Sequence, residues 1–135
     1  MKIGVVLISH GYMAKETLNS AQMIMGSIDN VHSFAMLSGY GIETTREKLN
    51  NLLDSLTDYD EVIIFADILG GTPCNIAFQE IVKKKKFKLV SGFNLGIVIE
   101  TLTLINTNSK IDIDNIVQSG KSTIKNISAK IDDMK

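Results

Sequence analysis

Short apolar runs alternate with segments of helical periodicity along this chain, and that alternation restricts the possible folds more than any other feature. Ile3–Ile8 and Glu61–Ala66 are nearly unbroken runs rich in β-branched residues, as expected for strands covered on both faces of a parallel sheet. Val31–Met36 and Phe87–Ser91 show a weaker strand pattern. The order of elements predicts an α/β fold with an open, doubly wound, mainly parallel sheet flanked by helices.

Five apolar stripes at helical spacing follow the predicted strands and indicate the helices. The last stripe contains Gly120, which is expected to kink or split its helix. In chain order the stripes are Ala14, Leu18, Ala21 and Met25; Ile42, Leu49, Leu52, Leu53 and Leu56; Cys74, Ala77, Phe78, Ile81 and Val82; Leu95, Val98, Ile99, Leu102 and Ile105; and Ile113, Ile116, Val117, Ile124, Ile127 and Ile131.

The chain has 135 residues, so we expect residues 1–135 to form a single domain. Fourteen basic and fifteen acidic residues leave a net charge of −1, which argues against nucleic-acid binding and against binding to anionic membranes. One cysteine cannot form an internal disulfide, and no apolar stretch approaches the roughly 18 residues of a membrane helix. We therefore expect a cytoplasmic protein.

Polar and glycine residues gather directly after each predicted strand. They form the segments Ser9-His10-Gly11, Ser38–Gly41, Asp67–Pro73 and Gly92–Asn94. In doubly wound sheets ligands bind at the carboxyl ends of the strands, where the strand order reverses. The functional site is expected at this edge.

His10 and Asp67 are the candidate reactive pair, since each ends an otherwise apolar strand. If the two strands are neighbours, the carboxylate can accept the Nδ1–H proton and leave Nε2 as a nucleophile. The alternative is structural: His10 satisfies a backbone group of its loop, and Asp67 is a turn or cap residue. The residues alone leave both readings open.

The segment Gly70-Gly71-Thr72-Pro73 has the composition of an anion site. Thr72 suits the N-cap of the following helix, and Pro73 suits its first helical position. Gly70 and Gly71 allow backbone N–H groups to turn inward at the positive end of that helix. The alternative is a well-capped helix without a ligand.

Other candidate residues carry weaker signals. A hydrolase built from Ser9, His10 and Asp67 is disfavoured because the chain has no G-x-S-x-G turn and Ser9 directly precedes His10. His32 is interpreted as structural and Cys74 as a core residue of its helix. The lysine run 83–86 is interpreted as a solvated helix end.

The combination of three segments resembles the mannose-type (mannose/fructose/sorbose) enzyme IIA of the bacterial sugar phosphotransferase system. The segments are the strand leading into Ser9-His10-Gly11, the run Asp67–Ala77, and Gly92–Leu95 with the following Glu100-Thr101-Leu102. Together they cover most of residues 1–105. The C-terminal stretch is similar to the family only in its helical character.

The resemblance implies that His10 accepts a phosphoryl group from the phosphocarrier HPr and passes it to enzyme IIB. It implies that Asp67 orients the imidazole, and that Gly70, Gly71 and Thr72 lie beside the phosphoryl group. It further implies a doubly wound fold and a homodimer, with the sugar bound by the membrane subunits IIC and IID. We expect IIB to be a separate polypeptide, and we expect neither a metal nor a cofactor.

Two alternatives stay open at this point. One is the related phosphotransfer subunit that feeds dihydroxyacetone kinase, which shares the first histidine motif. The other is a non-catalytic regulatory module of the same fold. The segment Gly70–Pro73 followed by Asn75 favours the sugar branch over the first, and the presence of both His10 and Asp67 argues against the second.

Overall fold

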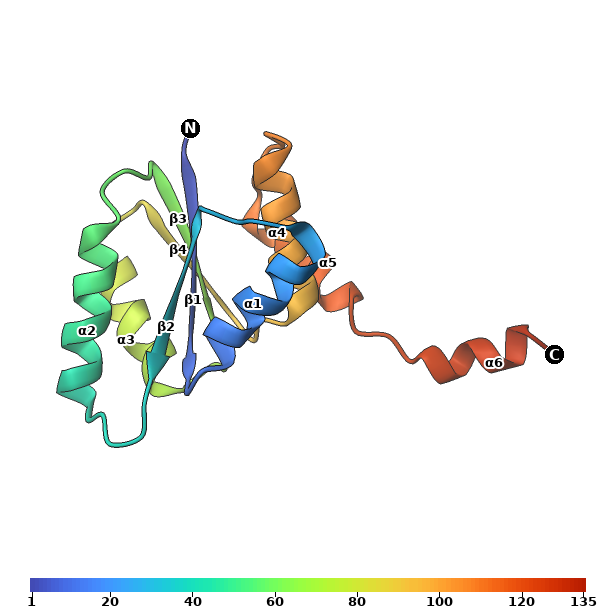
Figure 1. The fold of residues 1–135 in the computed structure, drawn as a ribbon, viewed down its shortest axis with the longest axis horizontal. Helices are drawn as coiled ribbons and strands as arrows, with labels where there is room; N and C mark the ends of the chain where they lie inside the picture. The colour runs from blue at the N-terminus through green and yellow to red at the C-terminus, as the bar shows by residue number, and fades with distance from the viewer. The chain divides into compact units, whose positions relative to one another are not determined.

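Four parallel strands form the central sheet in a computed structural model that describes residues 1–135 (Figure 1). They are β1 (Ile3–His10), β2 (Val31–Met36), β3 (Glu61–Ala66) and β4 (Phe87–Ser91), in the spatial order β2-β1-β3-β4. Every neighbouring pair is parallel. The predicted doubly wound sheet is confirmed, and it is entirely rather than mainly parallel.

The chain reverses its direction across the sheet between the two central strands. It moves outward from β1 to β2, returns to β3 on the other side of β1, and continues outward to β4. Such a reversal opens a crevice at the carboxyl ends of the central strands, where ligands bind in folds of this kind. His10 is the last residue of β1 and Asp67 directly follows β3, so both lie at this position.

Helices cover both faces of the sheet within residues 1–95, the first of two compact units (Figure 1). Helix α1 (Met13–Met25) lies on one face, and α2 (Ile42–Ser55) and α3 (Thr72–Ile81) lie together on the other. No helix of the chain combines the length and the apolar character needed to cross a bilayer. Aliphatic and small side chains fill the core between the sheet and the α2–α3 pair: Val6, Ile8, Leu49, Leu53, Val62, Ile64 and Ala77.

Residues 96–135 form the second compact unit. It contains all but the first residue of α4 (Leu95–Asn106), then α5 (Ile113–Ser122), the 3₁₀ turn η1 (Ile127–Ala129) and the short α6 (Lys130–Asp133). The Asp112 side chain caps α5 by accepting the N–H of Asn115 at 3.2 Å.

The last predicted stripe is split, but at Ser122 rather than at Gly120. Gly120 lies inside α5, where an added Cβ would come within 2.5 Å of Cδ1 of Ile97. The glycine therefore allows close packing of α5 on α4 rather than a kink. The isoleucines at 124, 127 and 131 lie beyond α5 and are exposed.

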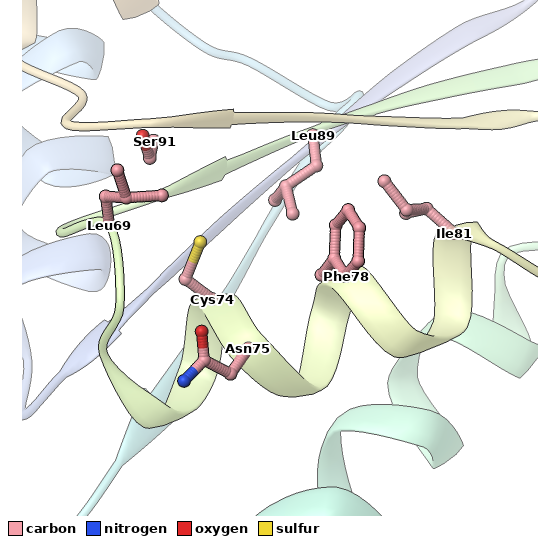
Figure 2. A pocket seen from close by; sticks show the side chains of 7 residues that line it. All are labelled: Leu69, Cys74, Asn75, Phe78, Ile81, Leu89 and Ser91. Carbon is pink, nitrogen blue, oxygen red and sulfur yellow. The ribbon is translucent and has the colours of Figure 1, made fainter.

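Three further residues of the predicted apolar stripes are also exposed and do not contribute to the core. Ile42 is the first residue of α2, and Val82 follows the last residue of α3. Phe78 lines an open pocket between α3 and β4, because β4 is the edge strand and no further strand covers that side (Figure 2).

The interpretation of the lysine run as a solvated helix end is wrong for Lys86, whose ammonium is partly buried, whereas Lys84 stays solvated but is paired. The Lys86 ammonium donates to the backbone carbonyl of Leu56, just beyond α2, at 2.6 Å. Lys84 forms an ion pair with Asp54 of α2. These lysines tie the segment before β4 to the C-terminal end of α2.

Candidate functional site

His10 and Asp67 lie next to each other at the carboxyl ends of the two central strands. β1 and β3 pair in a register that places Ile8 opposite Ala66, so both strands reach the same edge together. The ring Nδ1 of His10 lies 2.8 Å from Oδ2 of Asp67. The predicted proximity of the two side chains is therefore observed.

The Asp67 carboxylate is fixed by two further hydrogen bonds from the backbone. Its Oδ2 also accepts the backbone N–H of His10 at 2.9 Å, and its Oδ1 accepts the N–H of Ile68 at 2.9 Å. One oxygen thus holds both the main chain and the ring of the same histidine. Because three donors converge on it, the carboxylate has little freedom to rotate away from the imidazole.

The carboxylate determines which ring nitrogen of His10 can react. An ionised carboxylate only accepts hydrogen bonds, so the proton of the contact is on Nδ1. Nε2 keeps its lone pair and makes no hydrogen bond within the chain. The His10 side chain is 50% exposed while that of Asp67 is only 10% exposed. The imidazole is therefore accessible to a second molecule, while the carboxylate that holds Nδ1 is largely shielded.

Gly71 lies directly against the His10 ring. A Cβ added at Gly71 would come within 2.7 Å of Cε1 and 3.5 Å of Nε2 of His10. Its φ of −75° is available to any residue, so the position requires glycine for space rather than for backbone conformation. Gly70 differs, because its φ of +85° lies in the left-handed region and allows the turn after Asp67.

Helix α3 begins one residue earlier than the sequence predicts. The Gly71 carbonyl accepts the N–H of Asn75 at 2.9 Å, which makes Gly71 the N-cap. Thr72 is the first helical residue and Pro73 the second, and the prediction of Thr72 as the N-cap is wrong. Because Gly71 has no side chain, the start of the helix can lie against the His10 ring.

The N–H groups that face a potential anion are fewer than the sequence predicts. The Gly71 N–H donates weakly to the Ile68 carbonyl at 3.4 Å, and Pro73 has no N–H. The backbone N–H groups of Thr72 and Cys74 remain as donors in the first turn of α3, because no helical carbonyl precedes them to accept their hydrogen bonds. Since their helix begins against the imidazole, its positive end faces the site.

A pocket of about 250 Å³ lies behind this loop, and His10 does not line it. Figure 2 shows the Cys74 sulfur pointing into it from α3, towards Leu69 and the end of β4. Burial raises the pKa of the Cys74 thiol, the Asp67 charge adds to the rise, and a hydrogen bond with the Gly70 backbone opposes it. Asn75 Nδ2 donates to the Gly70 carbonyl at 3.2 Å. Cys74 is a buried free thiol, as predicted.

Two further residues have structural environments. His32 Nε2 lies 3.1 Å from the Tyr59 hydroxyl, and in the strand register it is opposite Val6, four positions before His10. Ser9 is fully buried, and its hydroxyl is bonded to the backbone on both sides of the turn after β1. No motif in the sequence signals the role of Ser9 or of Asn75. Nowhere in the chain do three His, Cys, Asp or Glu side chains gather so as to hold a metal ion.

Comparison with known proteins gives a consistent result. A family model described as "PTS system fructose IIA component" matches residues 4–118. The chain is 30% identical over 132 residues to the mannose-specific EIIAB component of Escherichia coli K12, covering 96% of this chain and 41% of that protein. It is 33% identical over 102 residues to the fructose-specific EIIA component of Bacillus subtilis, covering 76% of this chain and 70% of the relative. The chain thus spans less than half the length of the EIIAB relative.

Solved structures show the same similarity. The PTS IIA protein associated with the fucose utilization operon of Streptococcus pneumoniae superimposes with a TM-score of 0.87 at 28% identity, covering 97% of both chains. The mannose/sorbose-specific IIA subunit from Enterococcus faecalis gives a TM-score of 0.81 at 32% identity, covering 94% of this chain and 96% of that chain.

Proposed function

The chain belongs to the mannose-type EIIA family of the sugar phosphotransferase system, and from this premise we propose that it is a histidine phosphocarrier. In this proposal His10 accepts a phosphoryl group from HPr and passes it to enzyme IIB during sugar uptake. The observation that carries the proposal is the 2.8 Å contact between Nδ1 of His10 and Oδ2 of Asp67. It leaves Nε2 as an exposed nucleophile with a fixed orientation.

Phosphoryl transfer at this site requires one bond to form and one to break. The Nε2 lone pair of His10 attacks the phosphorus of the phosphohistidine on HPr, and a new P–N bond forms. The P–N bond of the donor breaks, and its electron pair returns to the donor imidazole. Asp67 accepts the hydrogen bond from Nδ1–H of His10, so that the proton stays on Nδ1, and stabilises the positive charge that develops on the ring. Transfer to IIB follows the same steps with His10 as the donor.

The beginning of α3 provides the complementary charge for the transferred group. The first-turn N–H groups of Thr72 and Cys74, the Thr72 hydroxyl and the positive end of the helix are suited to phosphoryl oxygens. Gly70 and Gly71 supply the turn and the space in which the group lies against the ring. Fixed dipoles of this kind stabilise charge without reorganising during the reaction.

The wider assignments rest on family membership. We propose that residues 1–135 are one mannose-type EIIA domain, that the protein is a cytoplasmic homodimer, and that its partners are HPr and IIB. The membrane subunits IIC and IID act downstream of IIB, and they bind the sugar.

Phosphorylation by purified components tests the proposal. Incubation with enzyme I, HPr and phosphoenolpyruvate is expected to add one acid-labile, base-stable phosphoryl group to His10. The His10→Ala variant should not be labelled, while His32→Ala, which removes the only other histidine, should be labelled as the wild type is. Label that persists in His10→Ala would refute the assignment, and an unlabelled wild type would favour the non-catalytic module.

Two further measurements define the chemistry and the acceptor. Phosphorus–nitrogen couplings in protein with ¹⁵N-labelled histidine should show phosphorylation on Nε2, because Asp67 occupies Nδ1. A coupling pattern for Nδ1 would contradict this geometry. The phosphorylated protein should then lose its label to IIB and not to a dihydroxyacetone kinase subunit. The reverse preference would identify the kinase branch.

A further inference from the structure

Ser9 connects the end of β1 to the turn and the helix that follow His10. Its side chain is fully buried at the end of β1. The hydroxyl oxygen accepts the backbone N–H of Ala14 at 2.8 Å, and the hydroxyl donates to the carbonyl of Gly11 at 3.1 Å. Ala14 is in the first turn of α1, so one hydroxyl connects the strand, the turn and the helix.

Ser9 is the side chain that caps the first turn of α1. The N-cap of α1 is Tyr12, whose side chain makes no capping hydrogen bond. The serine therefore caps α1 from outside the helix and satisfies one of its unpaired N–H groups. Its proton and an acceptor site are already used in these two bonds, and the side chain is sealed from solvent, so Ser9 is not a nucleophile.

The hydrogen bonds around His10 fall into two groups, one on each side of the residue. Asp67 holds the backbone N–H and the ring of His10. On the other side, Gly11 has a φ of +58° in the left-handed region and donates its N–H to the Met36 carbonyl at 2.8 Å. The Gly11 carbonyl accepts a single hydrogen bond, which comes from the Ser9 hydroxyl.

We propose that Ser9 is a positioning residue for phosphoryl transfer, because it holds the turn after His10 in the conformation that presents Nε2 to the donor. This inference rests on the proposed phosphocarrier function. Loss of the hydroxyl leaves the Gly11 carbonyl and the Ala14 N–H without this partner and loosens the turn, while every group that bonds to Asp67 is retained. A small displacement of the nucleophile slows transfer strongly, since the reacting atoms must be aligned.

Three variants of Ser9 separate the hydrogen bonds from packing. Ser9→Ala removes the hydroxyl, and Ser9→Cys keeps a side chain of similar size with much weaker hydrogen bonding. Ser9→Thr keeps the hydroxyl and serves as the rescue variant. Thr45→Val is the matched control, because Thr45 is also fully buried, its hydroxyl donates to the Gly41 carbonyl at 2.9 Å, and it forms no hydrogen bond with His10 or Asp67.

The rate of phosphorylation is measured at increasing concentrations of phosphorylated HPr, together with the final label per chain. For Ser9→Ala and Ser9→Cys we expect the maximal rate to fall by about tenfold or more. The half-saturating concentration should change by less than about twofold, because the docking surface is intact. The final label should stay at one phosphoryl group per chain, whereas partial unfolding would reduce it. Ser9→Thr and Thr45→Val should react at close to the wild-type rate.

The outcomes distinguish this inference from the function on which it rests. If the wild type and Thr45→Val are phosphorylated and Ser9→Ala reacts equally fast, the inference fails and the phosphocarrier function stands. Equal losses in Ser9→Ala and Thr45→Val also overturn it, since they indicate a general effect of losing a buried hydroxyl. If Ser9→Ala does not fold, the rate of Ser9→Cys decides. If the wild type is not phosphorylated, the proposed function itself fails.

Discussion

Replacing Gly71 with alanine is expected to disable the site while leaving the fold intact. The added Cβ would lie 2.7 Å from Cε1 of His10 and 3.0 Å from Cγ2 of Ile68. Ile68 is an exposed side chain that can move aside. The imidazole is half-exposed, so it too can move, but only by leaving its position beside Asp67.

The size of the effect follows from these distances. The ring must retreat by about 0.7 to 1 Å to restore an ordinary carbon–carbon contact. A shift of that size stretches or breaks the 2.8 Å contact between Nδ1 and Asp67. Misplacement of a reacting group by about 1 Å can reduce a rate by about 10²-fold, or close to 3 kcal/mol in activation free energy. We therefore expect Gly71→Ala to slow phosphorylation by about 10- to 100-fold.

Gly41→Ala provides a closely matched control. Gly41 is the N-cap of α2, as Gly71 is of α3, and both have extended backbone with φ near −75°. A Cβ at Gly41 meets nothing within 4 Å. Both variants should therefore lose the same small amount of stability, up to about 1 kcal/mol, from an alanine at an N-cap. Only Gly71→Ala should lose transfer.

The assay is the time course of label transfer from phosphorylated HPr, with thermal unfolding followed by circular dichroism. The reasoning is refuted if Gly71→Ala is phosphorylated as fast as Gly41→Ala. It is also refuted if Gly41→Ala loses as much activity as Gly71→Ala, because the contact with His10 would then not be the cause.

Three other predictions concern the carboxylate, the lysine contact and the buried thiol. Asp67→Asn keeps the side-chain shape but removes the negative charge and replaces one of two acceptor oxygens with an NH₂ donor, so phosphorylation should slow by about 10²- to 10⁴-fold. A rate near that of the wild type would mean that another group holds the ring. Lys86→Met should lower the free energy of unfolding in urea by about 1 to 2 kcal/mol through loss of the bond to Leu56, whereas the exposed Lys85→Met should change it by less than about 0.5 kcal/mol. Because burial raises the pKa of Cys74 above its ordinary value of 9.0, the unfolded chain loses the thiol proton first as the pH rises. Raising the pH from about 8 to about 10 should therefore lower the free energy of unfolding more in the wild type than in Cys74→Ala. The same pH dependence in both proteins would contradict this.

The strands were predictable from local composition. There is a physical reason why two of them show a stronger apolar pattern than the other two. The two strongest runs became the central strands β1 and β3, which are covered on both faces. The two weaker runs became the edge strands β2 and β4, in which only some residues are buried. An edge strand needs fewer apolar residues, so its sequence pattern is less distinct. Exposure of Phe78 has the same origin, since a periodic stripe does not show where the sheet ends.

The pairing of His10 with Asp67 was predictable from the sequence, but the contacts of Gly71 and Ser9 were not. The position of His10 and Asp67 at the ends of two apolar runs was sufficient to pair them once a parallel sheet was assumed. The N-cap at Gly71 was missed because residue preferences favour Thr72, while the actual constraint is a contact with a ring 61 positions earlier. Ser9 was missed for a similar reason. Its bonds depend on how the chain turns after β1, which no spacing pattern describes.

The pairing of β1 with β3 also links the chemistry to the order of folding. His10 and Asp67 are 57 positions apart, and β2 lies between them in the sequence but not in the sheet. Contacts across such a separation close a long loop and form slowly compared with local hairpins or helices. A chain with its helices formed but its two central strands still apart has a histidine and no orienting carboxylate. If His10 is the phosphoryl acceptor that we propose, a nascent or partly unfolded copy is expected to compete poorly with mature copies for the phosphoryl donor, because its histidine is not oriented. In the proposed function, a reactive imidazole therefore requires that β1 and β3 have already paired.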